Sequence, residues 1–275
     1  MMKTTMIVLA AASITSAASA GVVVKAADSS KTASLMHAGN RELTSLGFSG
    51  VSNLMGGSNF TQWTDGRLIN NIGTFGWTDP VTRDMNTSGN SISGNPDRAD
   101  SASFMTGEGA GKGTMKDVFG HDLGYKNMSW IIDGEDSGSY TIDLYYGLGK
   151  WIDSDADNST MELSVLERGG NSDFNVYGIR ADGSYTAAIF VSRSQTARVG
   201  WTLDTLEIGG SQQVHGVGIS FDDSWDHLIG VRIESKRNFN GPDIVAVGSV
   251  VAVPTPGSMG VLALGGLVGL RRRRN

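Results

Sequence analysis

The sequence predicts an all-β protein, an antiparallel β-sandwich with a jelly-roll-like arrangement. From residue 129 onward, apolar and polar residues alternate with a period of two, and Gly, Asn and Asp turn signals separate the runs. Glycine supplies 38 of the 275 residues, about twice its usual share of about 7%, as expected of a chain with many turns. No long amphipathic helix pattern competes with this interpretation.

Eight strands are expected in this half of the chain. Alternation is clear at residues 140–146, 161–165, 199–203 and 229–233, and it predicts one face on the core and one in water. Four further candidates are residues 174–179, 185–191, 214–221 and 244–251. Turn signals at 133–134, 169–171, 181–183, 209–210 and 240–242 divide them, which favours a sandwich.

The preceding residues give weaker signals. Residues 22–24 are compatible with a first strand, 34–46 carry a weak helical or irregular pattern, and the aromatic residues between 60 and 77 indicate strand pieces. Residues 86–114, rich in Asn, Ser and Gly, are expected to form a long loop. We expect residues 21–251 to form a single β-sandwich domain.

Residues 1–20 have the pattern of a secretory signal peptide. Lys3 precedes an apolar run at residues 6–12, and Ala18 and Ala20 form a small-x-small cleavage site. Signal peptidase and the secretion translocon are therefore expected partners.

Residues 252–275 have the pattern of a processed membrane tail. The proline-containing motif is Val253, Pro254, Thr255 and Pro256. An apolar run follows at 258–270, and the tail ends in an arginine cluster of Arg271, Arg272, Arg273 and Arg274. The arginines predict a cytoplasmic C-terminus. Residues 258–270 would form a short apolar helix of about 20 Å, against a hydrocarbon core of about 30 Å. This length favours a transient inner-membrane anchor, with an ordinary single-span tail anchor as the alternative.

The net charge of the chain limits the classes of partner that are expected. Without Lys3 and the four terminal arginines, 17 basic and 28 acidic residues remain, a net charge of −11. Nucleic acid is not an expected partner, because phosphate binding depends on clustered Lys and Arg. With no cysteine, stability must come from burial and hydrogen bonding without disulfides.

Four internal segments and the tail together carry a family resemblance. The segments are residues 131–140 (IIDGEDSGSY), 166–173 (LERGGNSD), 210–214 (GSQQV) and 239–243 (FNGPD). Over residues 130–275 the chain resembles exosortase-dependent bacterial surface proteins with a PEP-CTERM-type sorting tail, with Thr255 where that family usually has Glu. The resemblance implies export, tail processing by an exosortase-type protease and display at the surface of an exopolysaccharide-producing bacterium. It implies no catalytic activity.

Two other groups of residues suggest sites. Asp153, Asp155 and Asp157 have alternate spacing by which a turn can gather oxygen ligands around calcium, with Glu162 as a further ligand. The alternative is a solvated acidic loop. Trp151, beside this loop, and Trp225, between aspartates, are candidates for exposed carbohydrate-binding platforms.

Glu167 is the candidate acid of a glycoside hydrolase. Such an enzyme needs a second carboxylate about 5 to 10 Å away, and Glu135, Asp136, Asp222 and Asp223 are candidates. The alternative is a structural pair with the adjacent arginine at the end of a strand.

The expected function is that of an exported, non-enzymatic cell-surface or extracellular-matrix protein, sorted through its tail and associated with exopolysaccharide. A secreted carbohydrate-active enzyme with paired carboxylates and a calcium-dependent adhesion module are the alternatives.

Overall fold

A computed structural model describes residues 21–37, 40–52, 54–55, 65–70, 81–82, 99–101, 112–113, 130–132, 139–146, 150–155, 157–204 and 211–249. The expected signal peptide and sorting tail lie outside these residues. The early strands are β1 (Val23–Ala26), β2 (Ala33–His37), β3 (Asn40–Ser45), β4 (Asp65–Asn70), β5 (Val81–Thr82), β6 (Ala99–Ser101), β7 (Lys112–Gly113) and β8 (Trp130–Ile132). The later strands are β9 (Tyr140–Tyr145), β10 (Leu163–Arg168), β11 (Phe174–Arg180), β12 (Ile189–Val191), β13 (Ala197–Asp204), β14 (Ser211–Ser220), β15 (Leu228–Glu234) and β16 (Asp243–Ser249). Two 3₁₀ turns, η3 (Arg193–Gln195) and η4 (Asp223–Trp225), interrupt them.

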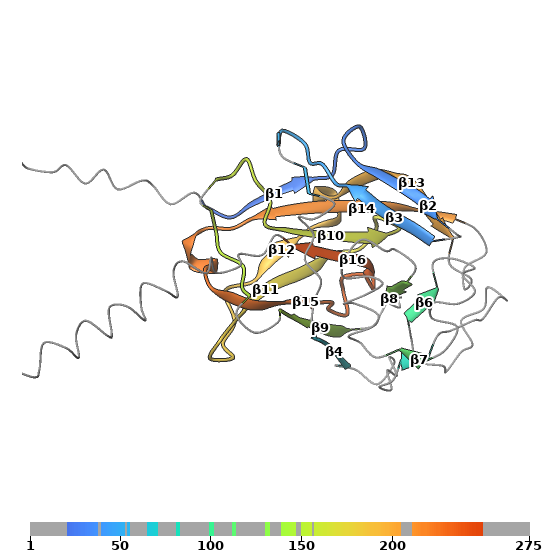
Figure 1. The fold of residues 1–275 in the computed structure, drawn as a ribbon. Helices are drawn as coiled ribbons and strands as arrows, with labels where there is room; N and C mark the ends of the chain where they lie inside the picture. The colour runs from blue at the N-terminus through green and yellow to red at the C-terminus, as the bar shows by residue number, and fades with distance from the viewer. Residues whose placement is uncertain are drawn as a thin grey trace, which may run out of the picture.

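Two antiparallel sheets form the body of the protein (Figure 1). The seven-stranded sheet has the order β1-β14-β10-β16-β8-β6, and β13 pairs with the same edge of β14 as β1 does. The five-stranded sheet has the order β12-β11-β15-β9-β4. Between β9 and β16 the chain crosses repeatedly from one sheet to the other, as in a jelly roll.

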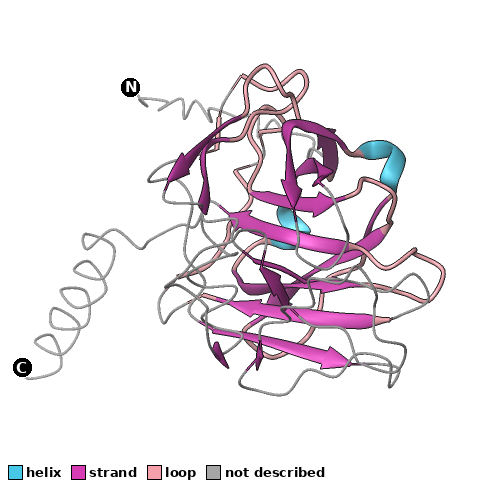
Figure 2. Cartoon of the chain, turned by 90° about the vertical axis from the view of Figure 1, so that its right-hand side faces the viewer, coloured by secondary structure: helices cyan, strands magenta, loops and turns pink. Residues whose placement is uncertain are grey.

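The main core lies between the sheets. It combines Leu163 and Val165 of β10 with Val176 of β11 and Val231 and Ile233 of β15. Seen from the side, the strands lie in stacked layers (Figure 2). The prediction of an all-β sandwich is therefore confirmed, and its stability derives from apolar area buried between two sheets.

A second core covers the opposite face of the seven-stranded sheet. The segment from Ala27 to Met55 packs there against residues such as Leu166 and Val199. A Cβ on Gly218 would lie 2.8 Å from Phe48, so this glycine of β14 permits the close approach. The sandwich thus carries an additional layer built from the beginning of the described chain.

This layer explains a wrong expectation. The alternation at residues 161–165 predicted a water-facing side, but every residue of β10 is buried. Its outward residue Leu166 packs in the second core with residues between Ala27 and Met55 instead of facing solvent. Residues 34–46, expected to be helical or irregular, belong largely to the β2–β3 hairpin, where Leu43 is buried.

Two further expectations need correction. The expected loop at residues 86–114 contains the short strands β6 and β7. The strand expected at residues 185–191 is limited to Ile189–Val191, because one extra residue between Tyr185, which bridges Ile179, and Ile189 interrupts the pairing with β11. The described residues include no helix long and apolar enough to cross a membrane.

Candidate functional site

The four segments that carry the family resemblance meet at one end of the sandwich. Ile132 pairs with Ile244, and the Tyr140 hydroxyl donates to the Pro242 carbonyl. The Gly169 N–H donates to the Gln213 carbonyl at 2.7 Å. We call residues 166–173, 213–215 and 239–243, together with Arg193, the motif cluster.

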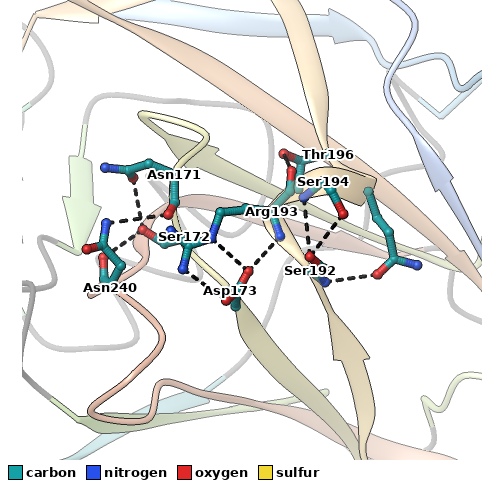
Figure 3. Close-up of polar contacts among 9 residues, drawn as sticks. Asn171, Ser172, Asp173, Ser192, Arg193, Ser194, Thr196 and Asn240 are labelled. Carbon is teal, nitrogen blue, oxygen red and sulfur yellow. Dashed lines mark hydrogen bonds and ion pairs between the residues drawn. The ribbon is translucent and has the colours of Figure 1, made fainter.

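Two arginine–carboxylate pairs hold the motif cluster together. Arg168, only 1% exposed, donates from Nε and Nη2 to Asp243 Oδ2 at 3.0 and 2.7 Å. Asp173 accepts from the Arg193 backbone N–H at 2.8 Å and from its guanidinium at 3.0 and 2.9 Å (Figure 3). The hydrogen bonds from Arg193 lower the pKa of Asp173. Charge-assisted contacts of this kind fix both position and orientation.

The turn between β10 and β11 requires its glycines. Gly169 and Gly170 have φ values of +102° and +67°, which residues with a Cβ adopt at a cost. A Cβ on Gly170 would also lie 2.4 Å from the His215 ring. The turn continues with the Ser172 hydroxyl, which donates to the Asn240 carbonyl at 2.8 Å (Figure 3).

Glu167 lies inside this cluster. It is 2% exposed, and its Oε2 accepts from the Gly170 N–H at 2.6 Å. Its Oε1 is buried and makes no hydrogen bond of ordinary geometry with a described residue. Burial raises the pKa of Glu167 from its ordinary value of 4.5 to about 8, against the opposing effects of nearby N–H groups and the Arg168 charge. The side chain is therefore a neutral acid at pH 7.

The structure separates Glu167 from two of its proposed catalytic partners. Glu167 is opposite His215 on β14, whereas Asp222 and Asp223 follow the far end of that strand. His215 and Ser220 are five residues apart, or about 17 Å at about 3.4 Å per residue. This exceeds hydrolytic spacing, so the pairing of Glu167 with Asp222 or Asp223 is wrong. The other candidates, Glu135 and Asp136, lie outside the described residues.

The opposite end of the sandwich holds the predicted calcium and tryptophan residues. Asp153 accepts from Trp151 Nε1 at 2.5 Å and from the His227 backbone at 3.0 Å. Asp155 accepts from the Asp157 N–H at 2.9 Å, and Asp157 accepts from the Ser159 N–H at 2.9 Å. These carboxylates therefore stabilise their own loop. Among the residues whose placement is described, no three acidic or histidine side chains gather as metal ligands would.

Glu162 is also buried at this end. Its Oε2 accepts from the Phe221 N–H at 3.0 Å and its Oε1 from the Asp155 N–H at 3.3 Å. Burial raises its pKa from 4.5 to about 8. Glu162 does approach the acidic loop as expected, but it contacts the loop through a backbone N–H.

The two candidate tryptophans differ in position. Trp225 is 2% exposed and stacks on Phe221 with a centroid distance of 4.7 Å, so the expectation of an exposed platform is wrong for this residue. Trp151 is half-buried, and the His227 ring stacks on it at 5.2 Å. His227 is 74% exposed, so it covers one face of the indole from the solvent side.

Sequence reasoning did not identify Arg193 or His215 as members of the motif cluster. Arg193 is 20 residues from Asp173, and only the short β11–β12 excursion brings the two together. The serine at position 192 followed by Gln195 is a capping box, which could have predicted the turn that positions Arg193.

Comparison with known proteins adds no relative: no family model, no curated protein and no solved structure matches this chain.

Proposed function

We propose that this chain is an exported, non-enzymatic surface or matrix protein, sorted through its C-terminal tail and associated with exopolysaccharide. The observation that carries the proposal is the convergence of the motif segments. Their polar groups contact one another, as in the pair between Arg168 and Asp243 and the bond between Gly169 and Gln213. Residues that satisfy each other in this way support an architecture and leave few groups for a substrate.

The positions of the described chain ends also support delivery through a processed tail. Val24 of β1 and Leu163 of β10 are both opposite Ile219, and Leu163 is also opposite Ser249. The first and last strands therefore meet the proposed signal peptide and sorting tail at the same end of the sheet. Val24 and Ser249 are separated by three strand spacings of about 4.8 Å, or about 14 Å. A domain with both ends on one side can be released from a membrane by two cuts near that side.

The two alternatives receive less support from the geometry. The hydrolase alternative loses the pairing of Glu167 with Asp222 or Asp223, as described above. In the calcium alternative, the carboxylates of Asp155 and Asp157 would have to bind the ion while they also accept hydrogen bonds within the loop. A calcium titration tests the second point: a rise in melting temperature that disappears in the double variant Asp155→Ala with Asp157→Ala would restore the adhesion module.

The proposed function is tested by intact mass and cell fractionation in the producing bacterium, with and without its sorting protease. We expect a mature species that starts near Gly21, ends near Pro254 and is found at the surface or in the medium. Deletion of the protease should leave the full C-terminus in the inner membrane. A full-length C-terminus in both strains would contradict sorting and indicate a tail-anchored protein.

A further inference from the structure

The outer face of the five-stranded sheet carries aromatic and polar side chains that the main core does not use. On β11 and β15 these side chains alternate with the core residues Val176 and Ile233. We call this set the aromatic–polar face: Asn175, Tyr177, Tyr185, Phe190, Arg232 and Glu234. Tyr185 is 39% exposed and Phe190 is 51% exposed, so apolar ring surface is open to solvent.

The strand register brings the rings of this face close together. Tyr177 is opposite Arg232, and the Tyr185 ring lies over that guanidinium with 4.1 Å from Cζ to the centroid. The rings of Tyr177 and Tyr185 meet edge to face at 6.4 Å. Phe190 is opposite Asn175, on the strand next to Tyr177. Diagonal neighbours on adjacent strands are about 7–8 Å apart, so the aromatic side chains follow one another along β11 and the chain that pairs with it.

Hydrogen bonds hold the polar groups of the face in place. Glu234 Oε2 accepts from Asn175 Nδ2 at 2.8 Å and from the Tyr177 hydroxyl at 2.7 Å. The remaining contact of this carboxylate, with Lys236 at 3.4 Å, also goes to Oε2. Oε1 therefore has no donor within the described part of the chain and can accept from a ligand hydroxyl. Side chains that are already fixed lose less entropy when a ligand binds.

Two described ion pairs lie on or beside this face. Arg232 donates from Nε and Nη2 to the two oxygens of Asp143 at 2.6 and 2.8 Å, and Lys236 pairs with Glu234. Within these two described pairs the cations and carboxylates balance, so neither pair offers excess positive charge to a polyanion. Exposed rings beside fixed hydrogen-bonding groups instead suit a ligand that has apolar faces and many hydroxyls.

We propose that the aromatic–polar face binds a neutral polysaccharide, with Tyr185 and Phe190 stacking on sugar rings and Glu234 accepting from hydroxyls. This inference rests on the proposed association with exopolysaccharide and places it on the five-stranded sheet, away from Trp151. The exposed rings lie along the chain that pairs with β11, so an extended polymer can lie on this edge of the sheet without entering a cavity.

The test is affinity electrophoresis of the folded mature domain in gels that contain hydroxyethyl cellulose, dextran or the neutral exopolysaccharide of the producing bacterium, with alginate as the anionic probe. We expect retardation by at least one neutral polymer. Tyr185→Ala and Phe190→Ala should each weaken binding at least tenfold, while Tyr185→Phe retains it. Leu54→Ala, which removes an exposed apolar side chain elsewhere, is the matched control and should bind normally.

The outcomes separate the face from the proposed function. Binding that survives both alanine variants but is lost in Trp151→Ala would overturn the aromatic–polar face and leave polysaccharide association intact. Binding to alginate alone would overturn the neutral ligand. No binding to any of these polymers would overturn both the face and the association, while the fractionation experiment would still decide sorting. Circular dichroism and unchanged melting temperatures identify variants that remain folded.

Discussion

Replacing Glu167 with glutamine should make the protein more stable in neutral and alkaline solution. The folded state holds this carboxyl protonated up to a pKa of about 8, whereas the unfolded chain releases the proton near 4.5. Between these values the folded state binds more protons, so its stability falls as pH rises. At about 1.4 kcal/mol per pH unit, this group opposes folding by up to about 3 kcal/mol at pH 7.

Glutamine removes that penalty but introduces an amide N–H₂ group where Oε1 lacks a hydrogen-bond partner among the described residues. An unsatisfied donor costs about 1–3 kcal/mol. At pH 8 the penalty of the wild type reaches about 5 kcal/mol, so we expect Glu167→Gln to gain about 2–4 kcal/mol there and to lose about 1–3 kcal/mol near pH 4.5. The free energies of unfolding of the wild type and the variant, plotted against pH, should therefore cross between pH 4.5 and pH 8. Such a crossing identifies a neutral buried acid.

The free energy of unfolding should be measured in urea at several pH values, followed by tryptophan fluorescence. Glu234→Gln is the matched control. Hydrogen bonds from Asn175 and Tyr177 help to lower the pKa of Glu234, so the protonation of this group changes the stability of the protein only at acid pH. If Glu167→Gln were less stable than the wild type by the same amount at pH 5 and pH 8, Glu167 would be ionised in the fold and our reasoning would be refuted.

Three further substitutions test the packing. Gly170→Ala should destabilise by about 2–4 kcal/mol, because it adds a left-handed residue and a clash with the neighbouring histidine ring; Gly183→Ala, with a φ of +82° but open space, should cost only about 1–2 kcal/mol. Arg168→Met should lower the free energy of unfolding in urea by about 3–5 kcal/mol, because it leaves the Asp243 carboxylate without its charged partner beside the core. Arg193→Met, at a partly exposed ion pair, should cost about 1 kcal/mol. Equal costs would contradict the burial argument. Trp225→Ala should cost about 3–5 kcal/mol by calorimetry, and a change below 1 kcal/mol would show that the indole is not in the core.

Local sequence pattern predicted most of the strands in the second half of the chain but not how they are covered. The alternation through Leu163 and Val165 correctly indicated a strand. Nothing near it in sequence indicates that Phe48, more than 100 residues earlier, contributes to the core on its outer side. Burial of that face depends on a contact between distant segments, which a period of two cannot encode.

The misplacement of Trp225 has a similar cause. Aspartates at 223 and 226 surround it, so its neighbourhood in sequence is polar. The Asp222 side chain caps η4 by accepting from the Ser224 N–H, and the short turn directs the indole onto Phe221 while the carboxylates stay outside. Three residues of 3₁₀ helix thus reverse what the neighbouring residues suggest. The motif cluster shows the converse: its residue types were identified correctly, but their partners required the fold.

The placement of the chain ends predicts the orientation of the unprocessed protein at a membrane. Eight residues, 250–257, separate β16 from the expected apolar helix at 258, and they can span at most about 28 Å. The end of the sandwich that holds Asp153 and Asp223 must then lie nearer the membrane than the motif cluster beside Ser194. Because the chain has no cysteine, Asp223→Cys and Ser194→Cys each give a single labelling site. In vesicles that carry the uncleaved protein, lipid-borne quenchers should reduce the fluorescence of a label at position 223 more strongly than at 194. Equal quenching at both sites would mean that the sandwich lies on its side, which would contradict this orientation.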